Sequence, residues 1–198
     1  MATSEPHRRR GARTRSNTRG LLVVSSFVLL ALSGAACGST TTTPPKVSST
    51  VVDALITAGN ASQRKGQSTL AASLYTKAIA DDPTNAVALY DLGDLDQIAL
   101  HDSAAAEADY RRALLVDPRF VDARFNLAIL ESASHSTSAI AAYEIIIGID
   151  ASDADAYLNL GFLLRATGKT AAGAAALHKA VTLDPALQSR LSQPVSAK

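Results

Sequence analysis

A spacing of about 34 residues between Asp-Pro pairs is the feature of this 198-residue chain that most constrains its fold. The pairs end at Pro83, Pro118 and Pro185, so the first two prolines are 35 residues apart and the last two are 67 apart. A missing member of the series would fall near Ala151, where Ala follows Asp in place of Pro. Self-similarity at a fixed period is typical of repeat proteins. The spacing therefore predicts four copies of one structural unit.

Three further columns recur before these marks, the first at a distance that varies by one residue and the other two at fixed distances. Small residues form two columns and large residues form the third: Gly59, Gly93, Ala128 and Gly161; Ala71, Ala106, Ala139 and Gly173; Tyr75, Tyr110, Tyr143 and Leu177. Small residues let two helices of a hairpin approach closely, and the large residues fill the space between adjacent hairpins. Apolar residues between the columns recur at helical spacing. The pattern predicts helices at 52–65, 68–81, 86–100, 103–116, 120–133, 137–149, 154–167 and 170–183.

From Val52 to Pro185 this pattern resembles the tetratricopeptide repeat family, whose unit is a helix-turn-helix. The resemblance implies an all-α fold, an α-solenoid of about four repeats at 52–85, 86–120, 121–153 and 154–187. The repeat domain would span 51–185, and 186–198 would be a short tail in which Leu187 and Leu191 partly cap the last repeat. The family's Trp is absent and is replaced by Leu55, Leu89, Arg124 and Tyr157. Repeat two has one extra residue near His101, and repeat three lacks one residue near His135.

The segment before the repeats has the character of an export signal. Residues 1–20 hold six Arg and one acid, and residues 21–36 carry no charge but are too short for a spanning helix. A basic region, an apolar stretch and small residues in this order are typical of a secretory signal peptide, which we assign to 1–36. The next residues, 37–50, contain Ser, Thr and Pro44-Pro45 and are predicted to be a tether.

The only cysteine, Cys37, stands at the end of the apolar stretch. Residues 32–37 resemble the lipobox of bacterial lipoproteins, although Gly34 stands where an aliphatic residue is usual. The resemblance implies that Cys37 carries a lipid and becomes the first mature residue. Two alternatives remain open: an uncleaved amino-terminal anchor, and soluble export without a lipid.

Charge and motifs narrow the function. Outside residues 1–20 the chain has 13 bases and 17 acids, and this mildly acidic balance argues against nucleic acid as the partner. There is no phosphate-binding glycine loop, no HExxH and no thiol in the repeats, so we expect no enzyme activity and no cofactor. His101 and His135 lie at equivalent turns, but no close ligand spacing accompanies them and no metal site is predicted. Asp91, Asp94 and Asp96 are expected to point to different faces of a helix.

In the family that the chain resembles, the first helices of the repeats line a concave groove. Matching the groove columns one residue at a time gives the partner-binding set Ile56, Asn60, Tyr90, Asp94, Gln97, Phe125, Ile129, Leu158, Phe162 and Arg165. Large apolar side chains at these positions favour a peptide or helix held by a few anchors. The alternative is that some of them belong to the core. Ile56 stands where relatives that clamp a carboxylate have Lys, so such a clamp is not expected.

These observations predict a tethered scaffold, on the extracytoplasmic side of a bacterial cytoplasmic membrane, that binds a protein or peptide partner in the groove. The alternative function is an accessory subunit of an envelope, secretion or cell-wall enzyme system.

Overall fold

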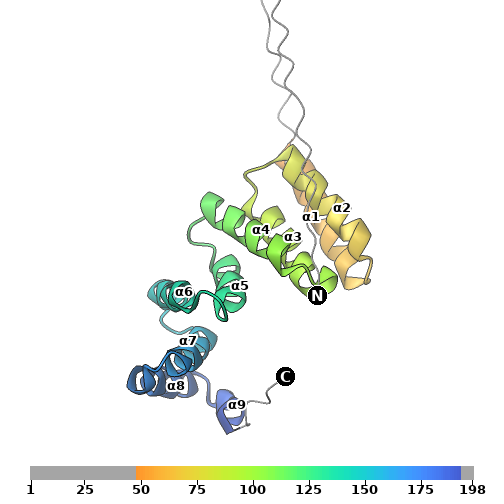
Figure 1. Cartoon of the computed structure of the whole chain (residues 1–198). Coiled ribbons are helices and arrows are strands. Elements are labelled where there is room, and N and C mark those ends of the chain that lie inside the picture. The colour runs from red at the N-terminus through yellow and green to blue at the C-terminus, as the bar shows by residue number, and fades with distance from the viewer. Residues whose placement is uncertain (1–47, 193–198) are drawn as a thin grey trace, which may run out of the picture. The chain divides into compact units, whose positions relative to one another are not determined.

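The computed structural model describes residues 48–192, so the predictions for the signal segment and for Cys37 lie outside the described residues. Eight long helices form four consecutive hairpins within this range (Figure 1). The hairpins are α1 (Ser49–Arg64) with α2 (Ser68–Asp81), α3 (Ala86–Leu95) with α4 (Ser103–Val116), α5 (Val121–Glu131) with α6 (Ser136–Ile149), and α7 (Ala154–Ala166) with α8 (Thr170–Leu183). Residues 48–192 contain no strand. The predicted all-α repeat fold is confirmed, and helix ends differ from the prediction by at most three residues apart from the break in the third helix.

The Asp of each Asp-Pro pair has a structural role that the sequence period reflects. Its Oδ1 accepts a hydrogen bond from the backbone N–H two residues later, which holds the turn that ends each second helix. The N···O distance is 3.1 Å from Thr84 to Asp82, 2.9 Å from Arg119 to Asp117 and 2.9 Å from Ala186 to Asp184. Asp150 makes the same bond at 2.8 Å, although no Pro follows it. The Asp therefore maintains the turn in all four repeats.

Within each hairpin the two helices touch through the small-residue columns. A Cβ added to Gly93 would lie 2.9 Å from Cε1 of Tyr110, and one added to Gly161 would lie 2.6 Å from Cγ of Leu177. Tyr75, Tyr110 and Tyr143 are almost fully buried at the equivalent positions of the second helices. Each large residue thus fills the space that the glycine or alanine opposite it leaves free.

The extra residue of repeat two is absorbed inside its first helix. Asp96–Leu100 forms the π-helix η1, and His101 follows it in the left-handed region with φ 56°. A single π turn adds one residue to a helix without breaking it. The predicted single helix at 86–100 therefore divides into α3 and η1, while the hairpin keeps its packing partners.

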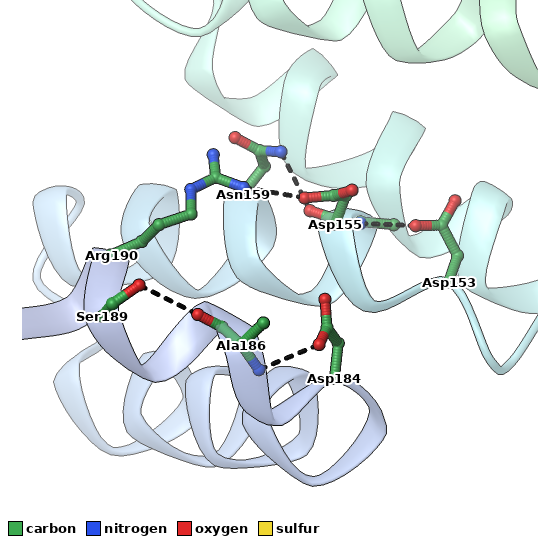
Figure 2. A network of polar contacts seen from close by, with 8 residues as sticks. Asp153, Asp155, Asn159, Asp184, Ala186, Ser189 and Arg190 are labelled. Atoms are coloured by element: carbon green, nitrogen blue, oxygen red, sulfur yellow. Dashed lines mark hydrogen bonds and ion pairs between the residues drawn. The ribbon is translucent and has the colours of Figure 1, made fainter.

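A short cap follows the last hairpin. The 3₁₀-helix η2 (Pro185–Leu187) and the five-residue α9 (Gln188–Ser192) fold back against the first helix of the last repeat, α7. Leu187 is buried against Leu158 and Leu177, and Leu191 packs beside them. Arg190 Nη1 lies 3.0 Å from Asp155 Oδ1 at the start of α7 (Figure 2). The cap predicted from Leu187 and Leu191 therefore covers apolar surface that would otherwise be exposed.

Candidate functional site

The candidate site lies on the face formed by the first helices α1, α3, α5 and α7, which we call the inner face. Polar side chains link neighbouring helices across it. Gln63 Nε2 on α1 donates to Asp94 Oδ2 on α3 at 3.0 Å, and Asn126 Nδ2 on α5 donates to the Tyr90 hydroxyl on α3 at 3.4 Å. These bonds show that side chains from three successive repeats converge on this face.

Tyrosines of the second helices reach the same face from behind. The Tyr75 hydroxyl shares its one proton between Asn60 Oδ1 and, at 2.9 Å, Gln63 Oε1, while the Tyr110 hydroxyl donates to Gln97 Oε1 at 2.8 Å. Burial, together with nearby carboxylates, raises the pKa of Tyr75 to about 12. These hydroxyls therefore stay neutral and hold Asn60, Gln63 and Gln97 in place. Asn60 and Gln97, which were predicted as groove residues, therefore use their side-chain oxygens for hydrogen bonds within the protein.

The charges of three carboxylates act on Tyr90. Burial, and after it the charges of Asp94, Asp122 and Asp91, raises the pKa of the Tyr90 hydroxyl. Burial also raises the pKa of Asp91 to about 6, against the opposing effect of a hydrogen bond from Asn60. Asp91 Oδ2 is buried and has no hydrogen-bond partner. In the described part of the chain, Asp91, Asp94 and Asp122 form no ion pair.

The prediction that Asp91, Asp94 and Asp96 point to different faces is therefore only partly right. Asp91 and Asp94 are three residues apart, less than one full helical turn, and both act on Tyr75 and Tyr90. Asp96 is the one that diverges. It is buried in η1, where burial and then the charges of Asp109 and Asp102 raise its pKa.

The second half of the inner face is apolar and partly open. Ile129 on α5 is 43% exposed and Phe162 on α7 is 37% exposed. Beside Phe162 lies an open hollow of about 250 Å³, lined by Ser132, Asn159, Phe162, Leu163 and Ala166. Arg165 is exposed on the same helix. This part of the predicted groove offers apolar surface together with room for a side chain.

The structure buries two of the predicted groove residues, Ile56 and Leu158, in the core, as the alternative interpretation of this column allowed. Ile56 is 7% exposed and packs with Val52, Ala78 and Ala88. Leu158 is fully buried against Leu177, Ala180 and the capping Leu187. The cause at Leu158 is the carboxyl-terminal cap, which covers this column in the last repeat.

Tyr90 and Phe125 occupy the same column in the middle repeats and are half-buried. The Tyr90 ring centroid lies 5.1 Å from that of Phe120, and the Phe125 centroid lies 5.6 Å from that of Tyr143 in an edge-on contact. One side of each ring therefore packs against the core, and the other side forms part of the inner face.

Sequence reasoning missed Gln63, Asp122 and Asn126. Gln63 falls in the same column as Gln97, which was predicted, so the period itself could have found it. Asn126 follows Phe125, and it bonds both Tyr90 and Tyr110, the latter at 3.3 Å. No sequence signal indicates that cross-repeat contact, because it depends on how α5 is placed against α3 and α4.

The tetratricopeptide repeat family model matches residues 154–187, which is the fourth hairpin with its turn. The fourth hairpin is therefore a tetratricopeptide repeat, and the other three hairpins share its helix-turn-helix fold. No curated protein matches the sequence.

Solved tetratricopeptide repeat structures share the fold. The chain is similar to MamA at 24% identity and TM-score 0.63, over 70% of this chain and 81% of MamA. It is similar to YrrB, described as a tetratricopeptide repeat protein with an unusual peptide-binding site, at 22% identity and TM-score 0.61, over 72% and 76% of the two chains. It is also similar to the first tetratricopeptide repeat domain of Spaghetti (RPAP3) bound to the HSP90 peptide SRMEEVD, at 22% identity and TM-score 0.58, over 63% and 99%.

Tetratricopeptide repeat proteins are generally interaction scaffolds rather than enzymes. Within residues 48–192, no helix is both long and apolar enough to cross a membrane.

Proposed function

We propose that this repeat protein is a non-enzymatic scaffold that binds a segment of a partner protein along its inner face. The observation that carries the proposal is the hollow beside Phe162, with Ile129 also exposed on the face. A partly exposed aromatic ring next to an open hollow can take a partner side chain out of water, and such anchors concentrate binding energy. Two of the structures that share the fold are described as binding peptides, which supports a peptide or helix as the ligand.

The proposal includes a membrane tether on the extracytoplasmic side of a bacterial cytoplasmic membrane. Its support is the sequence: the arginine-rich start, the uncharged stretch 21–36 and Cys37 at its end. Eleven residues separate Cys37 from the start of α1 at Ser49, and a fully extended chain of that length spans at most about 40 Å. A lipid on Cys37 would therefore hold the inner face close to the membrane, where a partner in the same membrane is within reach.

Site-specific photo-crosslinking tests the binding face. A photoreactive amino acid at position 162 should crosslink a partner protein in intact membranes. The matched control is position 115 on α4, where Leu115 is 83% exposed but belongs to a second helix. Crosslinks at 115 and none at 162 would contradict the proposal. The identity of the crosslinked protein would also decide whether the scaffold serves an envelope, secretion or cell-wall enzyme system.

A further inference from the structure

The inner face is divided into an acidic half and an apolar half. Asp91 and Asp94 follow Tyr90 on α3, and Asp122 lies one helical turn before Asn126, which donates to the Tyr90 hydroxyl. Farther along the chain, Phe162 lines the hollow and Ile129 is exposed on the same face. The two halves belong to successive repeats of one face, so one extended segment or one helix can cross both. The chemistry of its partner is therefore constrained at two places.

Within residues 48–192, no ion pair neutralises the acidic half. Some carboxylates of neighbouring helices do have basic partners: Arg111 Nη2 lies 2.8 Å from Glu131 Oε1, and Arg112 Nη1 lies 2.7 Å from Asp109 Oδ1. Near Tyr90, Asp94 accepts only the neutral Gln63 amide at 3.0 Å, and Asp91 has a buried oxygen without a hydrogen-bond partner. Arg64 is the nearby cation whose charge reaches Tyr75, and it forms no ion pair with these acids in the described residues.

Like charges gathered on an aromatic ring repel one another, and a cation relieves that repulsion. A Lys or Arg side chain placed at Tyr90 would meet carboxylates from two helices and the face of an aromatic ring. An acidic peptide would instead be repelled by these carboxylates. The peptide SRMEEVD, bound by a domain that shares this fold, has three acids, so its chemistry does not suit this surface.

We propose that the partner segment is cationic and apolar at separate points: a Lys or Arg lies among Asp91, Asp94 and Asp122, and an aliphatic or aromatic side chain lies in the hollow beside Phe162. This proposal rests on the proposed function, because it describes the segment bound to the same inner face. It goes beyond the proposed function by stating the charge of the segment and the order of the two contacts. The cation meets repeats two and three, and the apolar anchor meets repeats three and four.

Selection from a random peptide library tests the proposal without a known partner. The full chain is immobilised, and binders from a displayed library of twelve-residue peptides are sequenced and then measured by fluorescence anisotropy. We expect enrichment of peptides that combine Lys or Arg with a separate aliphatic or aromatic residue. Their affinity should fall as salt rises, because partly exposed charge pairs are screened.

Variants assign the two contacts. Asp94→Asn and Asp122→Asn should each weaken a selected peptide about threefold and reduce its salt dependence. Glu144→Gln, which removes one exposed acid from α6, is the matched control and should leave affinity unchanged. Phe162→Ala should weaken the peptide about tenfold or more without altering the salt dependence.

The outcomes separate this proposal from the proposed function. Selected peptides that are acidic or uncharged, yet lose affinity with Phe162→Ala, would overturn the cationic assignment and leave the scaffold function standing. Equal loss with Asp122→Asn and Glu144→Gln would also overturn it, because the effect would then reflect net charge alone. Selected peptides that ignore every inner-face variant, or a selection that yields no binder, would overturn both.

Discussion

The crossing of α7 and α8 offers a sharp test of the packing, through the substitution Gly161→Ala. The added Cβ would lie 2.6 Å from Cγ and 2.7 Å from Cδ2 of Leu177, and 3.0 Å from the backbone oxygen of Gly173. Contacts between carbon atoms are optimal near 3.5–4.0 Å, so both neighbours must move. Leu177 is only 6% exposed and packs against Leu158 and Leu187, so it cannot rotate away without disturbing the last hairpin and its cap.

Overpacking of this kind costs about 1–3 kcal/mol of the free energy of unfolding. A gain in helix propensity of up to about 1 kcal/mol on replacing Gly with Ala offsets part of that cost. We therefore expect a net loss of about 1–2 kcal/mol, which corresponds to a fall in melting temperature of roughly 3–6 °C for a domain of this size.

Gly148→Ala is the matched control. Gly148 also lies inside a helix, α6, but a Cβ added there meets no atom within 4 Å. The propensity gain is then unopposed, so we expect stabilisation of about 0.5–1 kcal/mol. Thermal unfolding followed by circular dichroism measures both variants. A Gly161→Ala variant that melts at or above the wild-type temperature, or two variants that shift in the same direction, would refute the reasoning about the close approach of α7 and α8.

Three other predictions follow from the inner face and the amino terminus. Because the folded-state pKa of Asp91 is raised from 3.8 to about 6, the unfolded chain loses this proton first, and the free energy of unfolding should fall as pH rises from 4 to 6. Urea unfolding should show that the wild type loses about 1–2 kcal/mol relative to Asp91→Asn over this window, after allowance for solvent screening. A constant difference between the two proteins would contradict this prediction. Phe162→Ala should weaken binding of a crosslinked partner by roughly 2 kcal/mol while melting changes little, whereas Phe125→Ala, which loses the ring contact with Tyr143, should lower the melting temperature as well. Metabolic labelling with a clickable fatty acid should mark the wild type and not Cys37→Ser, and equal labelling of both would remove the lipid assignment.

Much of the fold could be predicted from the sequence because the information is periodic. One hairpin cannot bury its apolar side alone, so every repeat must keep the same apolar pattern, including the small and large residues that pack its two helices together. Gly161 with Leu177, and Gly93 with Tyr110, are recognisable from their spacing alone, and the structure places each pair in contact. The Asp at each turn is equally local, since its side chain bonds a backbone N–H two residues away.

The environment of a column differs from repeat to repeat, and only the tertiary structure decides it. Ile56, Tyr90, Phe125 and Leu158 occupy one column, yet the outer two are in the core and the inner two are half-exposed. The reason is that neighbours, rather than position in the period, determine burial: the carboxyl-terminal cap closes over Leu158.

The acidic cluster at Tyr90 depends on tertiary structure for the same reason. Asp122 belongs to a different repeat from Asp91 and Asp94, and its approach to Tyr90 follows from the placement of α5 beside α3. Likewise, the sequence shows one extra residue near His101, but only the backbone shows that the residue enters a π turn with His101 in the left-handed region. Local and periodic interactions are thus encoded in the sequence pattern, whereas contacts between repeats depend on the angle at which each hairpin packs on the next.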